Sequence, residues 1–172
     1  RLLPPATVAW FIKTEFYKQL DEEFDIISIS DEDNMGWPNL YWRLVRPNKP
    51  DDIGPLHRDS WFWKLNNNFP KPMAKHHRIK VWIPIVTEPG KNGLMVEEGS
   101  HTRDDIEWSG EPRHGINKPV LLTGLNLLHP ILLELSEGNS IVFHDDLLHG
   151  GSLNRGECTR VSLEFTLLVK EA

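Results

Sequence analysis

The chain has 172 residues, a formal net charge of -6 and a pI near 5.7. That length suits one domain, 1–172, which buries roughly two thirds of its unfolded surface. The acidic balance, without any run of Lys or Arg, argues against binding to nucleic acid or to an anionic membrane. We therefore expect a single domain whose partner is a small molecule.

The cellular location can be inferred from the cysteine content and the hydropathy pattern. The single cysteine, Cys158, cannot form an internal disulfide, so nothing in the chain calls for an oxidising compartment. The longest apolar run, 121–135, is interrupted by polar residues and falls short of the roughly 18 apolar residues that a membrane span needs. We expect a cytoplasmic protein. Because residue 1 is Arg rather than Met, we also expect that the natural N-terminus is incomplete.

The N-terminal segment 4–24 has the pattern of a helix. Apolar residues recur at every fourth position, namely Val8, Ile12, Phe16, Leu20 and Phe24, and two prolines stand at the start. This spacing predicts one amphipathic helix with an apolar stripe.

Most of the remaining chain predicts short strands, because β-branched and aromatic residues alternate with polar ones between turn residues. The expected strands are 25–30, 39–46, 56–63, 79–86, 94–96, 119–122, 131–135, 140–144 and 160–169. The polar segment 64–77 is interpreted as a loop that forms a lid, and 102–118 as irregular. Many short strands after one helix predict a mainly β fold, an antiparallel double-stranded β-helix (jelly roll, cupin-like), with the helix flanking one sheet.

Two polar residues in the expected strand 56–63 can bind a metal. His57 and Asp59 are two positions apart, and side chains on a strand alternate between its faces, so both would point the same way. His149, from a distant strand, would then complete the two-histidine, one-carboxylate set that binds non-haem Fe(II) and leaves three positions open. Taken alone, a His-x-Asp pair is more often an ordinary polar pair on a half-exposed strand.

A second set of ligands competes with this assignment. His144, Asp146 and His149 are close in sequence and would need no distant partner. The chain turns through Leu147 and Leu148 between them, so we predict that these three side chains do not converge. The local set would also leave His57 unexplained.

Arg160 follows His149 by eleven positions and shares one strand face with Ser162. A buried guanidinium beside a hydroxyl suits a carboxylate, because the planar fork binds both oxygens and lysine does not reproduce that geometry. The pattern therefore indicates a site for a dicarboxylic acid. The alternative is an internal salt bridge between Arg160 and Glu164.

Taken together, these pieces resemble the phytanoyl-CoA dioxygenase-like (PhyH) branch of the Fe(II)/2-oxoglutarate oxygenases. The matching segments, which lie within 55–168, are 55–59, 92–96, 99–101, 138–144, 148–150 and Arg160. The resemblance implies that His57, Asp59 and His149 bind iron and that Arg160 and Ser162 bind the far carboxylate of 2-oxoglutarate. It also implies an aromatic residue, Trp63 or Trp82, near the cofactor. The chain departs from the family pattern at Gly151, where relatives often have a serine.

The resemblance implies an enzyme that uses Fe(II), 2-oxoglutarate and O₂ and hydroxylates a small polar molecule, with release of succinate and CO₂. Relatives that chlorinate lack the carboxylate ligand, so Asp59 favours hydroxylation. Lys64, Arg78 and Lys80 add positive charge near the expected site, which favours a polar or anionic substrate.

Several further aromatic and histidine residues are open to two interpretations. Trp61 and Phe62, with Trp63 and Trp82, either wall the site or belong to an aromatic-rich core. The adjacent His76 and His77 are expected to be solvated, and His101 and Trp108 are weaker pocket candidates.

Two other functions fit parts of the pattern. A jelly-roll carbohydrate-binding module would explain the seven tryptophans as stacking platforms and the acidic loops as Ca²⁺ ligands, but not the paired histidines or Arg160. A Zn-dependent hydrolase could use the same three ligands, and it would need a general base beside the metal-bound water.

Overall fold

A computed structural model describes residues 1–65, 76–113 and 116–170. Its helices are α1 (Pro5–Phe11), α2 (Glu15–Phe24) and α3 (Asp59–Leu65), with short 3-10 helices at Pro50–Asp52, Ser100–Thr102 and Leu125–Leu127. The strands are β1 (Ile26–Ile29), β2 (Tyr41–Val45), β3 (His76–Val86), β4 (Leu94–Val96), β5 (Trp108–Arg113), β6 (Ile116–Leu121), β7 (Ile131–Leu132), β8 (Ile141–His144), β9 (His149–Gly151) and β10 (Arg160–Lys170).

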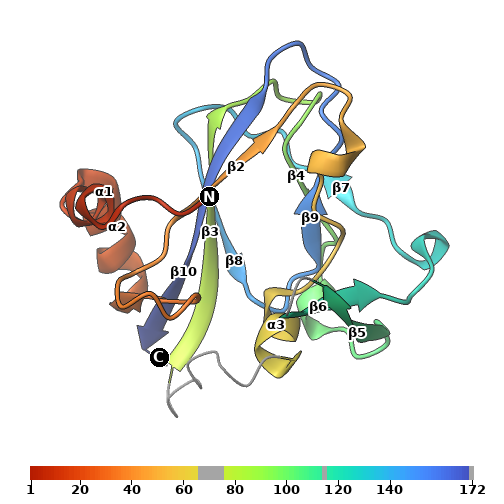
Figure 1. Cartoon of the computed structure of the whole chain (residues 1–172), viewed down its shortest axis with the longest axis horizontal. Coiled ribbons are helices and arrows are strands. Elements are labelled where there is room, and N and C mark those ends of the chain that lie inside the picture. Colours follow the sequence, from red (N-terminus) through yellow and green to blue (C-terminus); the bar gives the residue numbers. More distant parts are fainter. Residues whose placement is uncertain (66–75, 114–115, 171–172) are drawn as a thin grey trace.

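The strands form two antiparallel sheets and a separate hairpin. The larger sheet has the order β1-β10-β3-β8, and β2 also pairs with β10; the smaller sheet has the order β7-β4-β9. In Figure 1 the larger sheet stands between helices α1 and α2 on one side and the smaller sheet on the other. The expected mainly β, jelly-roll architecture with a helical flank is therefore present. No helix in these ranges is long and apolar enough to cross a membrane.

The single helix predicted for 4–24 is wrong, because the structure has two helices there. The side-chain oxygen of Thr14 accepts a hydrogen bond from the Tyr17 N–H at 3.3 Å, which caps the start of α2. The four-residue repeat still marks the side that packs on the sheet. Phe11 meets Phe165 of β10 with ring centroids 5.2 Å apart, and Val8 and Leu20 belong to the same buried cluster.

The larger sheet has one apolar face and one polar face, since successive side chains alternate along β3 and β10. Val81 and Phe165 lie on the outer face and pack with the helices. Trp82 lies on the opposite face and packs against Leu94 and Val96 of β4. We call this opposite face the inner face. It also carries four polar residues of β10, spaced two apart: Arg160, Ser162, Glu164 and Thr166.

The strand predicted for 56–63 is also wrong. Only His57 forms a bridge, with His149, and the chain then enters α3 at Asp59. The helical turn is stabilised by burial of Trp61, which is fully enclosed and stacks on Trp108 with ring centroids 5.0 Å apart and planes at 7°. Packing against a distant hairpin has overridden the local strand pattern.

The other predicted strands differ from the observed ones mainly in where they begin and end. The segment 102–118 is predicted to be irregular, but part of it forms β5, which pairs with β6; Gly110 and Pro112 obscure the alternation of β5 in the sequence. Strand β3 begins at His76, so His76 and His77 lie in a strand rather than a loop. Lys64 and Leu65, at the start of the predicted lid, end α3 instead, and the remaining lid residues, 66–75, lie outside the described residues.

Candidate metal centre

Two histidines that are far apart in the sequence face each other across one antiparallel bridge. The His57 N–H donates to the His149 carbonyl at 2.8 Å, and the His149 N–H donates to the His57 carbonyl at 2.9 Å. Directly opposed residues in such a pair project to the same side, and the two imidazole centroids are 4.6 Å apart. Gly150 permits this approach, because a Cβ there would lie 3.1 Å from the Leu56 nitrogen and the Pro55 carbonyl oxygen.

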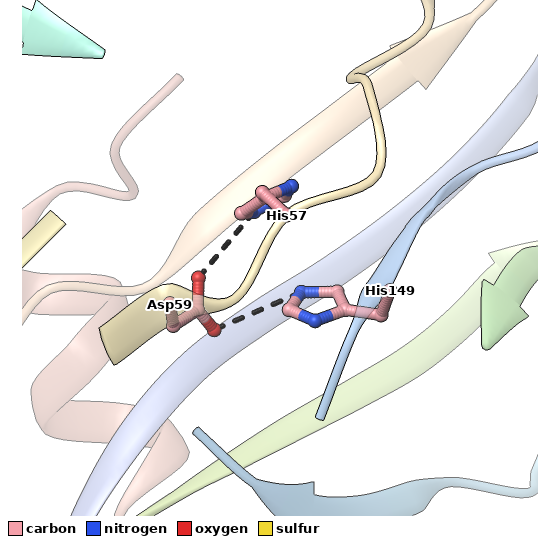
Figure 2. A group of neighbouring side chains, drawn as sticks. All are labelled: His57, Asp59 and His149. Carbon is pink, nitrogen blue, oxygen red and sulfur yellow. Dashed lines mark ion pairs between the residues drawn. The ribbon is translucent and has the colours of Figure 1, made fainter. Parts of the chain in front are cut away.

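Asp59 joins the two histidines from the first turn of α3. Its Oδ1 lies 3.5 Å from His57 Nε2, and its Oδ2 lies 3.7 Å from His149 Nε2. Figure 2 shows the carboxylate between the two rings. The intervening Arg58 turns away and donates from Nη2 to the carbonyls of Ser100 at 2.5 Å and Arg103 at 2.7 Å. His57 and Asp59 thus converge through a helix start, not through strand alternation.

The hydrogen bonds of the two rings prepare their Nε2 atoms for a metal. His57 Nδ1 lies 2.8 Å from the Pro55 carbonyl oxygen, and His149 Nδ1 lies 2.9 Å from that of Leu147. A carbonyl oxygen can only accept, so Nδ1 carries the proton and Nε2 of the neutral ring presents its lone pair. One ligand atom from each of His57, Asp59 and His149 lies within 4.8 Å of the others.

Electrostatics favour the protonation states that a cation needs. Burial lowers the pKa of His149 to about 4, so its ring is neutral at neutral pH. Burial by itself raises the pKa of Asp59, but the ammonium of Lys80 is the largest opposing influence and, together with the two neighbouring imidazoles, holds that pKa well below its usual range. Asp59 is therefore a carboxylate.

The competing set of His144, Asp146 and His149 is not assembled. In the described ranges His144 and Asp146 gather with Asp145 instead, as a separate and more exposed group. Asp146 accepts a hydrogen bond from the Ser60 hydroxyl, and the turn after His144 carries His149 to the other site, as the sequence predicted.

Lys80 and Phe143 also border the site; the sequence predicts the positive charge of Lys80 near it, but not the Phe143 ring. The Lys80 Nζ lies 3.5 Å from Asp59 Oδ2, and its side chain is 7% exposed. The Phe143 ring meets the His149 ring edge-on at 4.7 Å. On β3, Lys80 shares a face with Trp82, so its charge is buried within the site and not at its surface.

Arg160 and Ser162 lie buried on the inner face, and each has an atom without a partner. Arg160 Nη1 donates to the Gly93 carbonyl at 2.5 Å, whereas Arg160 Nε and Ser162 Oγ are buried with no hydrogen-bond partner in the described ranges. Burial lowers the pKa of Arg160 to about 10, which still leaves it charged at neutral pH. A buried guanidinium beside a free hydroxyl is suited to an anion.

The expected alternative, a salt bridge from Arg160 to Glu164, does not form. Glu164 Oε1 instead accepts from Arg43 Nε at 2.8 Å and from Arg43 Nη2 at 2.5 Å. Arg43 stands opposite Ser162 in the β2–β10 register, so the acid is already neutralised from the neighbouring strand.

The aromatic residues that the sequence offered as site candidates lie in different parts of the structure. Trp82 is buried with its ring centroid 5.8 Å from Arg160 Cζ, whereas Trp63 has Arg78 Cζ 4.2 Å from its ring centroid. Phe62 meets His57 edge-on at 5.6 Å. Trp61 belongs to the core with Trp108, so neither of these two lines the site.

Two smaller expectations concern His101 and Gly151. His101 is exposed beside His144, with ring centroids 6.3 Å apart. A Cβ at Gly151 would lie 3.9 Å from Arg160 Nη2, so this position faces the guanidinium. Ser152 does not replace a serine there, because its hydroxyl bonds to the backbone of Gly93.

Comparison with a family model identifies the chain. The model for phytanoyl-CoA dioxygenase (PhyH) matches residues 18–162, well over half of the 172 residues. The chain belongs to the PhyH family. A comparison with curated protein sequences found no match. PhyH proteins are Fe(II)/2-oxoglutarate-dependent oxygenases, so the chain is an enzyme of that class.

Solved structures share the fold of this PhyH chain. EvdO2 from Micromonospora carbonacea var. aurantiaca has a TM-score of 0.67 at 12% identity, covering 100% of this chain and 67% of EvdO2. EvdO2 has also been solved in complex with 2-oxoglutarate. The non-heme alpha ketoglutarate dependent carbocyclase SnoK from nogalamycin biosynthesis has a TM-score of 0.51 at 13% identity, covering 76% of this chain and 48% of SnoK. The chain thus spans about two thirds of EvdO2 and about half of SnoK.

The site of this PhyH protein fits the ion that its family uses. Asp59 is buried, and its Oδ1 faces the lone pair of His57 Nε2 at 3.5 Å. Two imidazole Nε2 atoms face that carboxylate, and two nitrogens with one carboxylate oxygen are the donor set of non-haem Fe(II).

Proposed function

We propose that the protein is an Fe(II)- and 2-oxoglutarate-dependent dioxygenase that hydroxylates a small polar molecule and releases succinate and CO₂. The observation that carries this proposal is the cluster of His57, Asp59 and His149, with both Nδ1 atoms bonded to carbonyls and both Nε2 atoms directed to the carboxylate. Iron with 2-oxoglutarate supplies the oxidant for a C–H bond, and the protein contributes position and surroundings.

The residues of the chain take separate roles in this proposal. His57, Asp59 and His149 would hold the ion. Arg160 and Ser162 would bind the far carboxylate of 2-oxoglutarate through the fork and the hydroxyl, and Trp82 would shield that pair from water. Such placement of reactants is the main contribution of a protein to this type of chemistry. The 2-oxoglutarate complex of EvdO2 supports the cosubstrate assignment.

The carboxylate of Asp59 supports hydroxylation as the outcome, because it leaves no ligand position for a halide. Detection of a chlorinated product from the unmodified protein in chloride buffer would contradict it. A polar substrate is supported by two positive charges, those of the exposed Lys64 and of Arg78, whose guanidinium lies over the Trp63 ring. His57 is the most exposed of the three ligands, with 21% of its side chain accessible, so the substrate would approach from that side.

A spectrum tests the proposal directly. Anaerobic addition of Fe(II) and 2-oxoglutarate should produce a weak visible charge-transfer band, because the keto acid chelates iron only at an open site. His149→Ala should lose the band, and His144→Ala, from the neighbouring group, should keep it. Absence of the band, with hydrolytic activity that depends on Zn²⁺, would instead support the hydrolase.

The carbohydrate-binding alternative receives no support from the two buried tryptophans. Trp61 and Trp82 are at most 2% exposed, so neither ring can stack on a sugar. The hydrolase alternative needs a free acid near the metal. Glu164 and Glu32, whose charges act on Lys80, both have partners, since Glu164 binds Arg43 and Glu32 accepts a hydrogen bond from Thr166.

A further inference from the structure

We propose that Lys80 is a positioning residue that keeps Asp59 bound end-on to the metal, by occupying one carboxylate oxygen. The proposal rests on the metal site proposed above and goes beyond its three ligands. It assigns a function to a buried lysine that the metal site and the cosubstrate site do not otherwise use.

The contact is specific and buried. Lys80 lies on the central strand β3, opposite Thr166 of β10 and Phe143 of β8. Its Nζ lies 3.5 Å from Asp59 Oδ2, the carboxylate oxygen that is buried without a hydrogen-bond partner. This is the sole ion pair that Lys80 makes within the described ranges.

The two other acids whose charge acts on Lys80, Glu164 and Glu32, have partners of their own. Arg43 binds Glu164, and the hydroxyl of Thr166 donates to Glu32. These two contacts leave Lys80 and Asp59 as each other's partners. Burying an ammonium is unfavourable unless it is paired, and an apolar residue would pack at this position without that cost. Packing alone therefore does not explain a lysine here.

The pairing has a consequence for coordination. An unrestrained carboxylate can bind a divalent ion through one oxygen or through both. With two histidines and an end-on carboxylate, an octahedral ion keeps three open positions, enough for a chelating keto acid and O₂. With a chelating carboxylate it keeps two. An ammonium on Oδ2 leaves Oδ1 for the ion, so Lys80 protects the third open position.

The test counts the water molecules on bound Mn²⁺ by proton relaxation, which needs no turnover. The unmodified protein should hold three exchangeable waters, and 2-oxoglutarate should displace two of them. Lys80→Met, which keeps the length and loses the charge, should hold two waters, a loss of about one third of the bound-water relaxivity. Lys80→Arg should restore three. Lys91→Met, which removes the same charge from an exposed pair with Glu88, should also hold three.

The possible outcomes separate this proposal from the one on which it rests. Unmodified protein that binds no Mn²⁺ would refute the metal site itself. Three waters in both the unmodified protein and Lys80→Met would refute the role of Lys80 alone, as would a rise to four through loss of the carboxylate. Circular dichroism shows whether Lys80→Met folds. If it does not, the water count of the unmodified protein still tests the proposal, because two waters on its bound Mn²⁺ would show that Asp59 does not bind end-on.

Discussion

Replacement of Arg160 by lysine tests the cosubstrate site. Arg160 is 4% exposed and charged; its Nε has no partner among the described residues, while its Nη1 donates to the Gly93 carbonyl. Glu164, the one acid on its own strand face, is bound to Arg43. The guanidinium therefore retains donors for a carboxylate. Lysine keeps the positive charge and loses the planar fork.

The expected loss follows from the number of bonds removed. Lysine at this position would retain one charge-assisted hydrogen bond of the two that the fork provides. A hydrogen bond to a charged group contributes about 1.5–3 kcal/mol. The Kd for 2-oxoglutarate should therefore rise about 10- to 150-fold. Iron affinity should change little, because none of the three proposed ligands is altered.

The assay is an anaerobic titration of the Fe(II) complex with 2-oxoglutarate, followed through the visible band. Arg46→Lys is the matched control, since it makes the same exchange in an exposed pair with Asp52 and should leave the Kd unchanged. An unchanged Kd in Arg160→Lys, with a lower free energy of unfolding, would show that Arg160 only anchors the Gly93 carbonyl.

Three other outcomes are expected. Alanine at His57, Asp59 or His149 should abolish tight Fe(II) binding measured by calorimetry and leave the circular dichroism spectrum intact; retention of iron by all three would refute the assignment. Burial lowers the pKa of His149 from 6.5 to about 4. Between these two pH values, His149 is therefore protonated in the unfolded chain but not in the folded one. The metal-free protein should lose about 3 kcal/mol of unfolding free energy there, and His149→Asn should remove that loss in urea titrations at stepped pH; an unchanged pH slope would contradict it. Phe165→Ala, which empties a fully buried position under α1, should cost about 3–5 kcal/mol by urea unfolding; a loss below 1 kcal/mol would show that the cluster collapses around the gap.

Local patterns in the sequence were sufficient to predict which side chains share one face of a helix or strand. Alternation along 160–169 predicted that Arg160 and Ser162 share a face, and both are buried on the inner face of β10. The apolar repeat in 4–24 identified the side that packs on the sheet, although Thr14 divides the segment into two helices. Such periodicities are properties of neighbouring residues, so they can be read without knowing the fold.

The geometry that joins His57 to Asp59 could not be predicted in the same way. The prediction that His57 and Asp59 lie together assumed a strand, and that assumption is wrong. Asp59 begins a helix whose Trp61 is buried against Trp108. That contact joins α3 to a stretch, 102–118, for which the sequence pattern predicted no regular structure. Secondary structure at such a position is decided by tertiary packing rather than by local preference.

The sequence by itself determined which chemical groups are available: two histidines, an aspartate and an arginine with its neighbouring serine, in an order that resembles one enzyme family. Only the tertiary structure decided which charges meet. Arg43 reaches Glu164 across 121 positions of sequence, which leaves Arg160 without a carboxylate, and β3 places Lys80 beside Asp59. The reason is physical: partners on adjacent strands are set by sheet register, and register depends on the packing of the whole fold.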